Sequence, residues 1–475
     1  MVEWDANVFS CAQYNKTVAF RAIGRYNYRP MDNESLLLSL GVVRPSARTA
    51  ASMFNDVFPD AAPRPNERHR IFDERSTIGL MLGQALNRNA PCKDAVRRLQ
   101  IEFGETASSS TAAYCKARYR VRPETVRIMS TRLSAEADGL CDTYGFNRIL
   151  ALDATTFQMS DTDANRSEWP YAGGQKPGCG FPVASALMAH SLVGKGSEVL
   201  AMASWKAHDF RLYVESSGSF REGDLQVGDR AFCSYTAFAL LREAKADGIF
   251  RGKEWCLKTR ADDIALGDGD RITVWRKCQS KRSMTVPKER REGFPDEIRV
   301  RVITATIRAR GFRDEKIVVV TSLLDPEKYP KEMILKLYLR RWEIEVSFRD
   351  MKTTLRYEFV RGQSPRMVKL EIEILLLAYN LMRYVMSRGG KGSQGIRFGI
   401  ASTSAAVKSF LSVIQSVYRS GRSCARAFSR LVAAVVSDVL PRRKRRPYVR
   451  AVKRRPKPYP LLTKPRGEYA SEEVK

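Results

Sequence analysis

Residues 338–352 read Tyr-Leu-Arg-Arg-Trp-Glu-Ile-Glu-Val-Ser-Phe-Arg-Asp-Met-Lys, and they are the most informative part of the chain. On a helix that turns about 100° per residue, Arg341, Glu345 and Lys352 lie roughly 60°, 20° and 40° from Tyr338. The four polar side chains therefore share one stripe. Glu345 is predicted to be an acid held among two cations and a phenol.

The same helical geometry gives other residues of this stretch structural roles. Glu343 and Asp350 fall on the opposite side of the helix, and we expect them to face solvent. Trp342 is expected to pack the helix against a sheet. A salt-bridge ladder on an exposed face is the common explanation for such a charged helix, so Glu345 alone does not indicate a site.

Two further acids favour a shared site over that explanation. Asp153 follows the apolar run 149–152, and Asp229 follows the apolar segment 225–227. An unpaired carboxylate at the end of a buried strand is costly unless hydrogen bonds or a metal ion satisfy it. Three carboxylates from separate elements are the ligands that hard divalent cations prefer. The sequence therefore predicts a two-metal site for phosphodiester chemistry.

Hydrophobic periodicity predicts the elements around these acids. Helical spacing covers 73–87, 92–101, 110–120, 123–136 and 235–246, and later a long helix from 329 to about 355, a second at 365–386 and a helical pair within 402–439. Strands are expected at 149–157, 183–190, 198–204, 225–227, 255–258, 272–276, 298–302 and 316–321. The expected fold class is an α/β core in which a mixed sheet with flanking helices is interrupted by a β-rich insertion.

Composition points to a polyanionic partner. The 475 residues include 81 Lys and Arg against 52 Asp and Glu, a formal net charge of +29. Such a surface usually displaces counterions from nucleic-acid phosphates, and a membrane surface is the weaker alternative. The nine cysteines lack metal or disulfide spacing, and there is no signal peptide or long apolar stretch. We expect a soluble intracellular protein with free thiols.

The spacing Tyr-x2-Arg-x3-Glu-x6-Lys at Tyr338, Arg341, Glu345 and Lys352 resembles the signature of bacterial DDE transposases of the insertion-sequence-four family. The segment 150–155, Leu-Ala-Leu-Asp-Ala-Thr, looks like the first-acid strand of that family. The segment 227–234, Val-Gly-Asp-Arg-Ala-Phe-Cys-Ser, looks like its second-acid segment. The resemblance covers about residues 70 to 440.

This resemblance implies an RNase H-like catalytic core in which Asp153, Asp229 and Glu345 hold two Mg²⁺ ions, with Mn²⁺ as a substitute. It implies a transposase that binds the terminal inverted repeats of a mobile element and carries out metal-dependent cleavage and strand transfer. The implied partners are double-stranded DNA, as transposon ends and target, and a second copy in a dimeric synaptic complex. The implied location is the cytoplasm of a bacterium, at the nucleoid.

The predicted DNA contacts follow from the same resemblance and from the charge pattern. Phosphates near the transposon end are assigned to three residues of the stripe, Tyr338, Arg341 and Lys352, and to Arg230 beside the second acid. Trp255 and Trp275 lie in the insertion, where some relatives stack a flipped base on a tryptophan, although a buried core position is the commoner fate of either residue.

Other candidates are weaker. Asp161 and Asp163 are alternative metal ligands that fit a turn better. The three histidines are too dispersed for a metal site. Basic stripes at Lys93, Arg97 and Arg98 and at Lys116, Arg118 and Arg120 suit a solvated face or phosphate contacts equally well.

The expected organisation has six parts. Residues 1–145 form a mostly helical DNA-binding domain, 146–250 and 324–390 the two parts of the RNase H-like core, and 251–323 the β-rich insertion. Residues 391–440 form C-terminal helices. Residues 441–475 form a basic, Pro-rich tail expected to order only on an anion.

Two other functions remain open from the sequence. One is an RNase H-like nuclease or resolvase with the same metal ions and without strand transfer. The other is a transposase-derived DNA-binding protein that has lost its chemistry. The sequence does not specify the inverted repeat, the target preference, an excision hairpin, the dimer interface or the base-reading residues.

Overall fold

The computed structural model describes residues 72–440, except 73, 104–109, 173–177, 278–282, 308–314, 391–397 and 420–424, together with residue 468. The expectations for residues 1–71, for His69 and for the basic tail at 441–475 lie outside the described residues. The path of the chain through these gaps also lies outside the described residues.

A mixed sheet of ten strands runs through the described part of the chain. Its order is β3-β2-β1-β4-β5-β9-β8-β7-β6, and β10 pairs with the far end of β1. The strands are β1 (Arg148–Met159), β2 (Val183–Ser191), β3 (Ser197–Ser204), β4 (Asp224–Gly228), β5 (Asp247–Arg251), β6 (Ile264–Gly267), β7 (Asp270–Arg276), β8 (Glu297–Ile307), β9 (Glu315–Thr321) and β10 (Phe359–Val360).

The first five strands have the RNase H-like arrangement. β1, β2 and β3 form an antiparallel meander, and β4 and β5 add to β1 in parallel. The strands from 251–323 extend this same sheet, because β9 pairs antiparallel with β5. The expected fold class is therefore confirmed, and the domain boundaries remain predictions.

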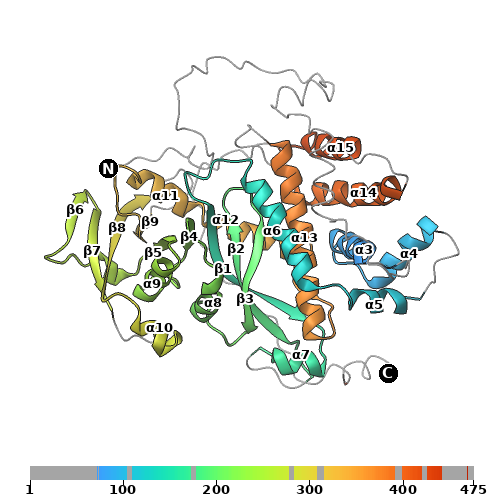
Figure 1. The fold of residues 1–475 in the computed structure, drawn as a ribbon, viewed down its shortest axis with the longest axis horizontal. Coiled ribbons are helices and arrows are strands. Elements are labelled where there is room, and N and C mark those ends of the chain that lie inside the picture. The colour runs from blue at the N-terminus through green and yellow to red at the C-terminus, as the bar shows by residue number, and fades with distance from the viewer. Residues whose placement is uncertain are drawn as a thin grey trace, which may run out of the picture.

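Helices cover both faces of the sheet, as Figure 1 shows. They are α3 (Glu74–Leu86), α4 (Cys92–Phe103), α5 (Ala112–Arg118), α6 (Pro123–Asp138), α7 (Asp163–Glu168), α8 (Asp209–Glu215), α9 (Tyr235–Glu243), α10 (Lys288–Glu292), α11 (Lys331–Leu339), α12 (Trp342–Arg349), α13 (Pro365–Gly389), α14 (Ile400–Arg419) and α15 (Ala425–Val436). Short 3-10 helices are η3 (Ser216–Ser219), η4 (Glu254–Leu257) and η5 (Ser283–Thr285), and η6 (Asp350–Thr354) is a π-helical turn.

Strand β1 separates two hydrophobic cores. Ile149 and Ala151 pack into the core that includes α6, α11, α12 and α13. Leu150 and Leu152 pack into the other core, with Phe210 of α8 and the apolar face of α9. Side chains alternate across a strand, so this division fixes the face on which every later residue of β1 points.

Two expected elements differ in the structure. The long helix from 329 to about 355 is divided into α11, a turn at Arg340–Arg341, α12 and the π-helical turn η6. The expected strand at 255–258 is part of the 3-10 helix η4, with Trp255 in it. Both differences change where side chains point.

No helix in the described ranges is both long and apolar enough to span a membrane. No disulfide joins the six cysteines that these ranges contain.

Candidate functional site

Two adjacent parallel strands bring Asp153 and Asp229 together. Ala151 of β1 is paired with Val227 of β4, and each acid lies two residues farther along the chain. Asp153 therefore points to the face of β1 that α12 covers. Asp229 follows the end of β4, where its Oδ1 accepts a hydrogen bond from the backbone N–H of Ala231 at 2.7 Å.

Glu345 reaches these strands from α12, and Arg341 joins it to the first acid. Nη2 of Arg341 donates a hydrogen bond to Oε1 of Glu345 at 2.7 Å. Nη1 of the same guanidinium lies 3.9 Å from Oδ2 of Asp153. The Arg341 side chain is thus an internal cation between two carboxylates that come from different elements.

The three acids interact electrostatically. Burial is the main reason that the pKa of Asp153 rises to about 6, and the negative charges of Asp229 and Glu345 add to it. The backbone N–H of Ala154 and the guanidinium of Arg341 oppose that rise. A fourth acid, Asp209 in the first turn of α8, has its pKa raised by burial and by the charge of Asp229. The site therefore concentrates negative charge that a cation would relieve.

The donor chemistry of this site suits a hard divalent cation, because all three side chains offer carboxylate oxygens. The distances between the side chains do not yet match a metal site. Across the described residues, no group of three or more His, Cys, Asp or Glu side chains is arranged to hold a metal ion. Arg341 supplies the positive charge between Asp153 and Glu345 in this arrangement.

Tyr338 and Lys352 flank the acids in different ways. Tyr338 is only 5% exposed; burial raises the pKa of its hydroxyl, and the nearby guanidinium groups of Arg341 and Arg251 oppose that rise. Lys352 lies in the π-helical turn, with Nζ 5.9 Å from the ring centroid of Phe157. Phe157 is on the same face of β1 as Asp153. Lys352 is therefore placed along the strand that carries the first acid, and burial lowers its pKa.

The remaining predicted DNA contacts lie at different depths. Arg230 is exposed beside Asp229. Trp255 is 43% exposed, whereas Trp275 is 4% exposed. Their ring centroids are 5.0 Å apart, and Trp275 also meets the ring of Phe238 edge-on. The buried ring of Trp275 thus supports one side of the exposed ring of Trp255.

Three structural expectations for the stretch 338–352 were wrong. Glu343 forms ion pairs with Lys195 and Arg340 and does not face solvent freely. Asp350 is 9% exposed and receives a hydrogen bond from Nη2 of Arg383 at 3.0 Å. Trp342 does not pack against the sheet, because 59% of it is exposed. The angular positions on one isolated helix do not show which elements pack against the side that carries Glu343 and Asp350.

The alternative ligands have other partners. Asp161 is paired with Arg166 at 2.7 Å and accepts a hydrogen bond from the hydroxyl of Tyr171. Extended chain advances about 3.3 Å per residue, which carries residue 161 far beyond Asp153. Asp163 is exposed in the first turn of α7. His190 is 1% exposed with Nδ1 2.9 Å from Oγ of Ser197, a structural position.

The basic stripes of the N-terminal helices are divided between exposed and paired residues. Lys93, Arg97 and Lys116 are exposed. Arg98 pairs with Asp94 at 3.0 Å. Arg118 is turned inward, where it donates a hydrogen bond to the Cys92 sulfur at 3.0 Å. Arg120 is also exposed, and its Nη2 donates a hydrogen bond to the carbonyl of Phe72 at 3.0 Å. Lys93, Arg97 and Lys116 therefore remain candidates for phosphate contacts.

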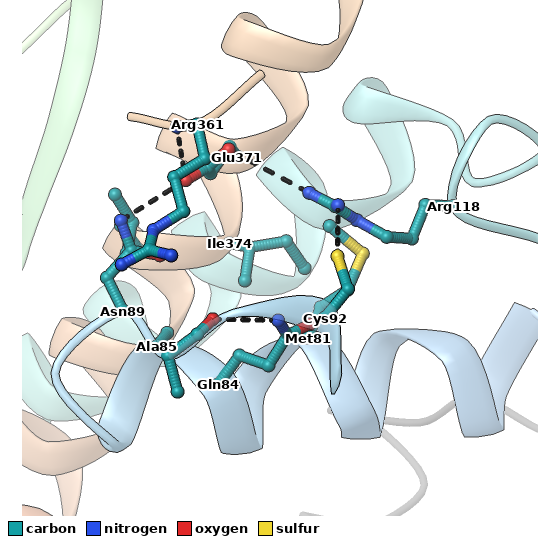
Figure 2. A pocket seen from close by; sticks show the side chains of 11 residues that line it. Met81, Gln84, Ala85, Asn89, Cys92, Arg118, Arg361, Glu371 and Ile374 are labelled. Atoms are coloured by element: carbon teal, nitrogen blue, oxygen red, sulfur yellow. Dashed lines mark hydrogen bonds and ion pairs between the residues drawn. The ribbon is translucent and has the colours of Figure 1, made fainter. Parts of the chain in front are cut away.

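Figure 2 shows the pocket that Arg118 enters, between α3, α5 and α13. Glu371 on its wall accepts hydrogen bonds from Asn89 and from the backbone N–H of Arg361. None of the three acids of the site lines it. This pocket joins the N-terminal helices to α13 and is separate from the carboxylates.

Sequence reasoning did not identify Arg251, Asp209 or Lys195. Arg251 is the last residue of β5 and lies near Tyr338 because α11 packs against β5. Asp209 meets Asp229 through the packing of α8 against the sheet. No local spacing signals contacts of this kind, because the partners are distant in the sequence.

Comparison with known proteins identifies similar chains. Residues 144–381 match the family model described as the transposase DDE domain. The chain is 25% identical over 411 residues to transposase InsG for insertion sequence element IS4 of Escherichia coli (strain K12), covering 84% of this chain and 89% of that one. It is 28% identical over 173 residues to putative transposase y4zB of Sinorhizobium fredii (strain NBRC 101917 / NGR234), covering 35% and 43%. A piggyBac transposase synaptic complex with hairpin DNA aligns at a TM-score of 0.34 and 9% identity, over 86% and 81% of the two chains.

Proposed function

Because this chain belongs to the transposase DDE domain family, in the branch of insertion sequence four, we propose that it performs cut-and-paste transposition with Asp153, Asp229 and Glu345 as its catalytic acids. It binds the terminal inverted repeats of its element, cuts both ends and joins them to target DNA. The observation that carries this proposal is the convergence of Asp153 from β1, Asp229 from the end of β4 and Glu345 from α12, with Arg341 between Asp153 and Glu345.

The family generally uses divalent metal ions, and we propose Mg²⁺, with Mn²⁺ as a substitute. Asp153, Asp229 and Glu345 are the residues that would hold two such ions. When bound, the ions would activate the attacking water or 3′-hydroxyl and stabilise the leaving oxygen at phosphorus. Burial is the main cause of the raised pKa of Asp153, and the charges of Asp229 and Glu345 add to it; a bound cation would favour the ionised form against both.

The cations and the phenol of the stripe position the DNA. Arg341 is suited to bind a phosphate through two parallel N–H donors. The ammonium group of Lys352, in η6 beside Phe157 of β1, offers a single positive charge to another phosphate. Tyr338 is buried, so its contribution is to hold Arg341 and Arg251 through its hydroxyl. Arg230, exposed beside Asp229, contacts a neighbouring phosphate. None of these side chains transfers a proton.

The larger complex contains DNA and two copies of the chain. The exposed ring of Trp255, supported by Trp275, offers a stacking surface for a base. Pairing the two ends of one element requires two active sites, so a homodimer forms the synaptic complex. A protein with this substrate works at the bacterial nucleoid.

The decisive experiment is cleavage and strand transfer of labelled DNA that carries the ends of the element, with Mg²⁺ or with EDTA. The wild-type protein and Glu345→Gln are compared. Metal-dependent release of a 3′-hydroxyl and joining to target, absent from Glu345→Gln, is the expected result. Cutting without joining would instead identify a nuclease or resolvase. Tight binding to the ends without any cutting would identify a DNA-binding protein that has lost its chemistry.

A further inference from the structure

The turn between strands β2 and β3 is tied to the start of α12 by charged side chains that the proposed reaction does not use. Nζ of Lys195 donates a hydrogen bond to the carbonyl of Leu192 at 2.8 Å and forms an ion pair with Oε2 of Glu343. Nε of Arg340 donates to the other carboxylate oxygen, Oε1, at 3.1 Å. Both oxygens of Glu343 are thus bound by cations from two different elements.

Arg340 closes this cluster onto the backbone of the hairpin. Its Nη2 donates a hydrogen bond to the same carbonyl of Leu192 that Lys195 uses. Leu192 itself is fully buried in the core beside α12. The Lys195–Arg340–Glu343 cluster, here called the hairpin clamp, therefore joins a buried point of the sheet to the turn that separates α11 from α12.

The hairpin on which this cluster stands is held independently from its other side. The backbone N–H of Gly194 donates to Oδ1 of Asp138, at the end of α6, at 2.7 Å. A Cβ at Gly194 would lie 2.6 Å from the backbone of Ala137, so no side chain fits there. Oδ1 of Asn380 in α13 accepts from the backbone N–H of Ser197 at 2.8 Å. The hairpin is a fixed support and not a loop that follows α12.

The clamp acts on the face of α12 opposite the acids. Glu343 and Glu345 are two residues apart, which is about 200° on a helix. When Glu343 is held against the hairpin, Glu345 is directed toward Asp153, and Arg341 stands in the turn between the clamped residues. The clamp thus fixes the rotation of α12 about its own axis. A short helix of this kind needs such a restraint, because the turn at Arg340–Arg341 separates it from α11.

We propose that Lys195, Arg340 and Glu343 are positioning residues that aim Glu345 and Arg341 at Asp153. This inference rests on the proposed role of Glu345. The clamp residues do not touch DNA or metal; they act through α12. Residues that orient a ligand from behind typically contribute about 10- to 100-fold to metal affinity or to rate.

The first test compares Glu343→Gln with the wild type in three measurements: Mn²⁺ binding by calorimetry, single-turnover cleavage at saturating DNA, and affinity for the DNA ends. Mn²⁺ affinity and cleavage rate are expected to fall by about 10-fold or more, while DNA affinity changes by less than about 2-fold. Glu168→Gln is the matched control, because Glu168 forms an exposed ion pair with Lys369 at 3.2 Å between two other elements.

A second variant removes the cation without disturbing the hairpin. Lys195 has a φ of +65°, which glycine adopts without strain, so Lys195→Gly should keep the turn. The double variant Lys195→Gly with Glu343→Gln should be no worse than the poorer single variant, since both break one cluster.

The outcomes separate the clamp from the proposed function. Lowered thermal stability with unchanged Mn²⁺ affinity and cleavage rate in both single variants would reduce the cluster to a structural one and overturn the proposal. Multiplicative effects in the double variant would overturn it as well. If the wild type itself neither cleaves nor joins DNA, the proposed function fails, and the positioning role falls with it.

Discussion

At the scale of single residues, Asp153 combines a central position with an unfavourable charge. Burial and two neighbouring acids raise its pKa to about 6, so its anion costs free energy in the folded chain at neutral pH. A carboxylate that lowers the stability of the fold indicates a role in function, because strongly shifted pKa values cluster at functional sites.

Replacement of Asp153 by Asn tests this directly. Cleavage should fall by roughly 10³-fold or more, as for other members of a catalytic set, while binding to the DNA ends persists. Because Asn removes a repelled charge, the melting temperature should stay equal or rise. Labelled-end cleavage, gel-shift binding and thermal unfolding measure the three quantities. A variant that fails to fold or to bind would make Asp153 a structural residue.

Glu373 on α13 is a half-buried acid outside the site, and its charge should show in the pH dependence of stability. Burial is the largest cause of a pKa raised to about 7, with Glu198 and Glu124 adding to it and Arg127 opposing. The folded chain therefore holds this proton at pH values where the unfolded chain has lost it. The resulting stability is complete below the unfolded pKa of about 4.3 and is lost as pH rises through about 7.

Glu373→Gln should remove that dependence. Between pH 5 and pH 8, the wild type should lose roughly 1–3 kcal/mol more of its free energy of unfolding than the variant does. Urea unfolding at the two pH values gives the difference. Glu136→Gln, at an exposed position of α6, is the control and should behave like the wild type. If the free energy of unfolding of Glu373→Gln and of the wild type changed equally between pH 5 and pH 8, the raised pKa of Glu373 would be contradicted.

At the scale of elements, the sequence predicted the strands better than the helix that carries Glu345. The two-residue alternation of β1 put Asp153 on the functional face, and the parallel pairing of β1 with β4 brought Asp229 beside it. The contact between Arg341 and Glu345 could also be read from their spacing of four residues. What could not be read was the turn at Arg340–Arg341, since both residues remain in helical backbone geometry.

The errors at Glu343 and Asp350 come from the elements that pack on the other side of this helix. Angular position on an isolated helix says which residues share a face, and it does not say what packs against the opposite face. The hairpin at Lys195 and the side chain of Arg383 on α13 occupy that face. Both come from distant parts of the chain, so no local pattern indicated them. Trp342 is left exposed in the first turn of α12.

The insertion element offers a contrast between two tryptophans in contact. Trp275 is buried on β7, and truncation to Ala should cost about 3–5 kcal/mol of stability. Trp255→Ala should cost far less stability and should weaken binding to the DNA ends by roughly 10-fold or more, the scale of one base–aromatic stack. Urea unfolding and fluorescence anisotropy measure the two effects. Equal destabilisation by both changes, with unchanged DNA affinity for Trp255→Ala, would make Trp255 structural.

At the scale of the whole molecule, a single sheet links the acids to the insertion. β5 connects the strands that carry Asp153 and Asp229 to β9 and then to β8 and β7. Trp275 on β7 and Arg251 on β5 are therefore placed on the same framework as the acids, and Tyr338 links Arg251 to Arg341. Under the proposed function, backbone hydrogen bonds of one sheet would keep DNA at the insertion and DNA at the acids in a fixed relation.

The net charge of +29 predicts a contribution to DNA affinity that does not depend on the DNA sequence and that falls with salt. Residues 441–466 contain twelve Lys and Arg and no acid, so we expect them to add affinity for phosphates without reading sequence. Deleting 441–475 should weaken binding to the inverted repeat and to unrelated DNA by the same factor, and it should make the decline of affinity with salt shallower. A variant with these twelve residues changed to Gln keeps the length and should match the deletion. Titrations at 50 and 200 mM salt test both. If the deletion weakened binding to the inverted repeat alone, the tail would contact bases. Its Lys and Arg residues would then contribute to sequence recognition and not to general attraction to phosphates.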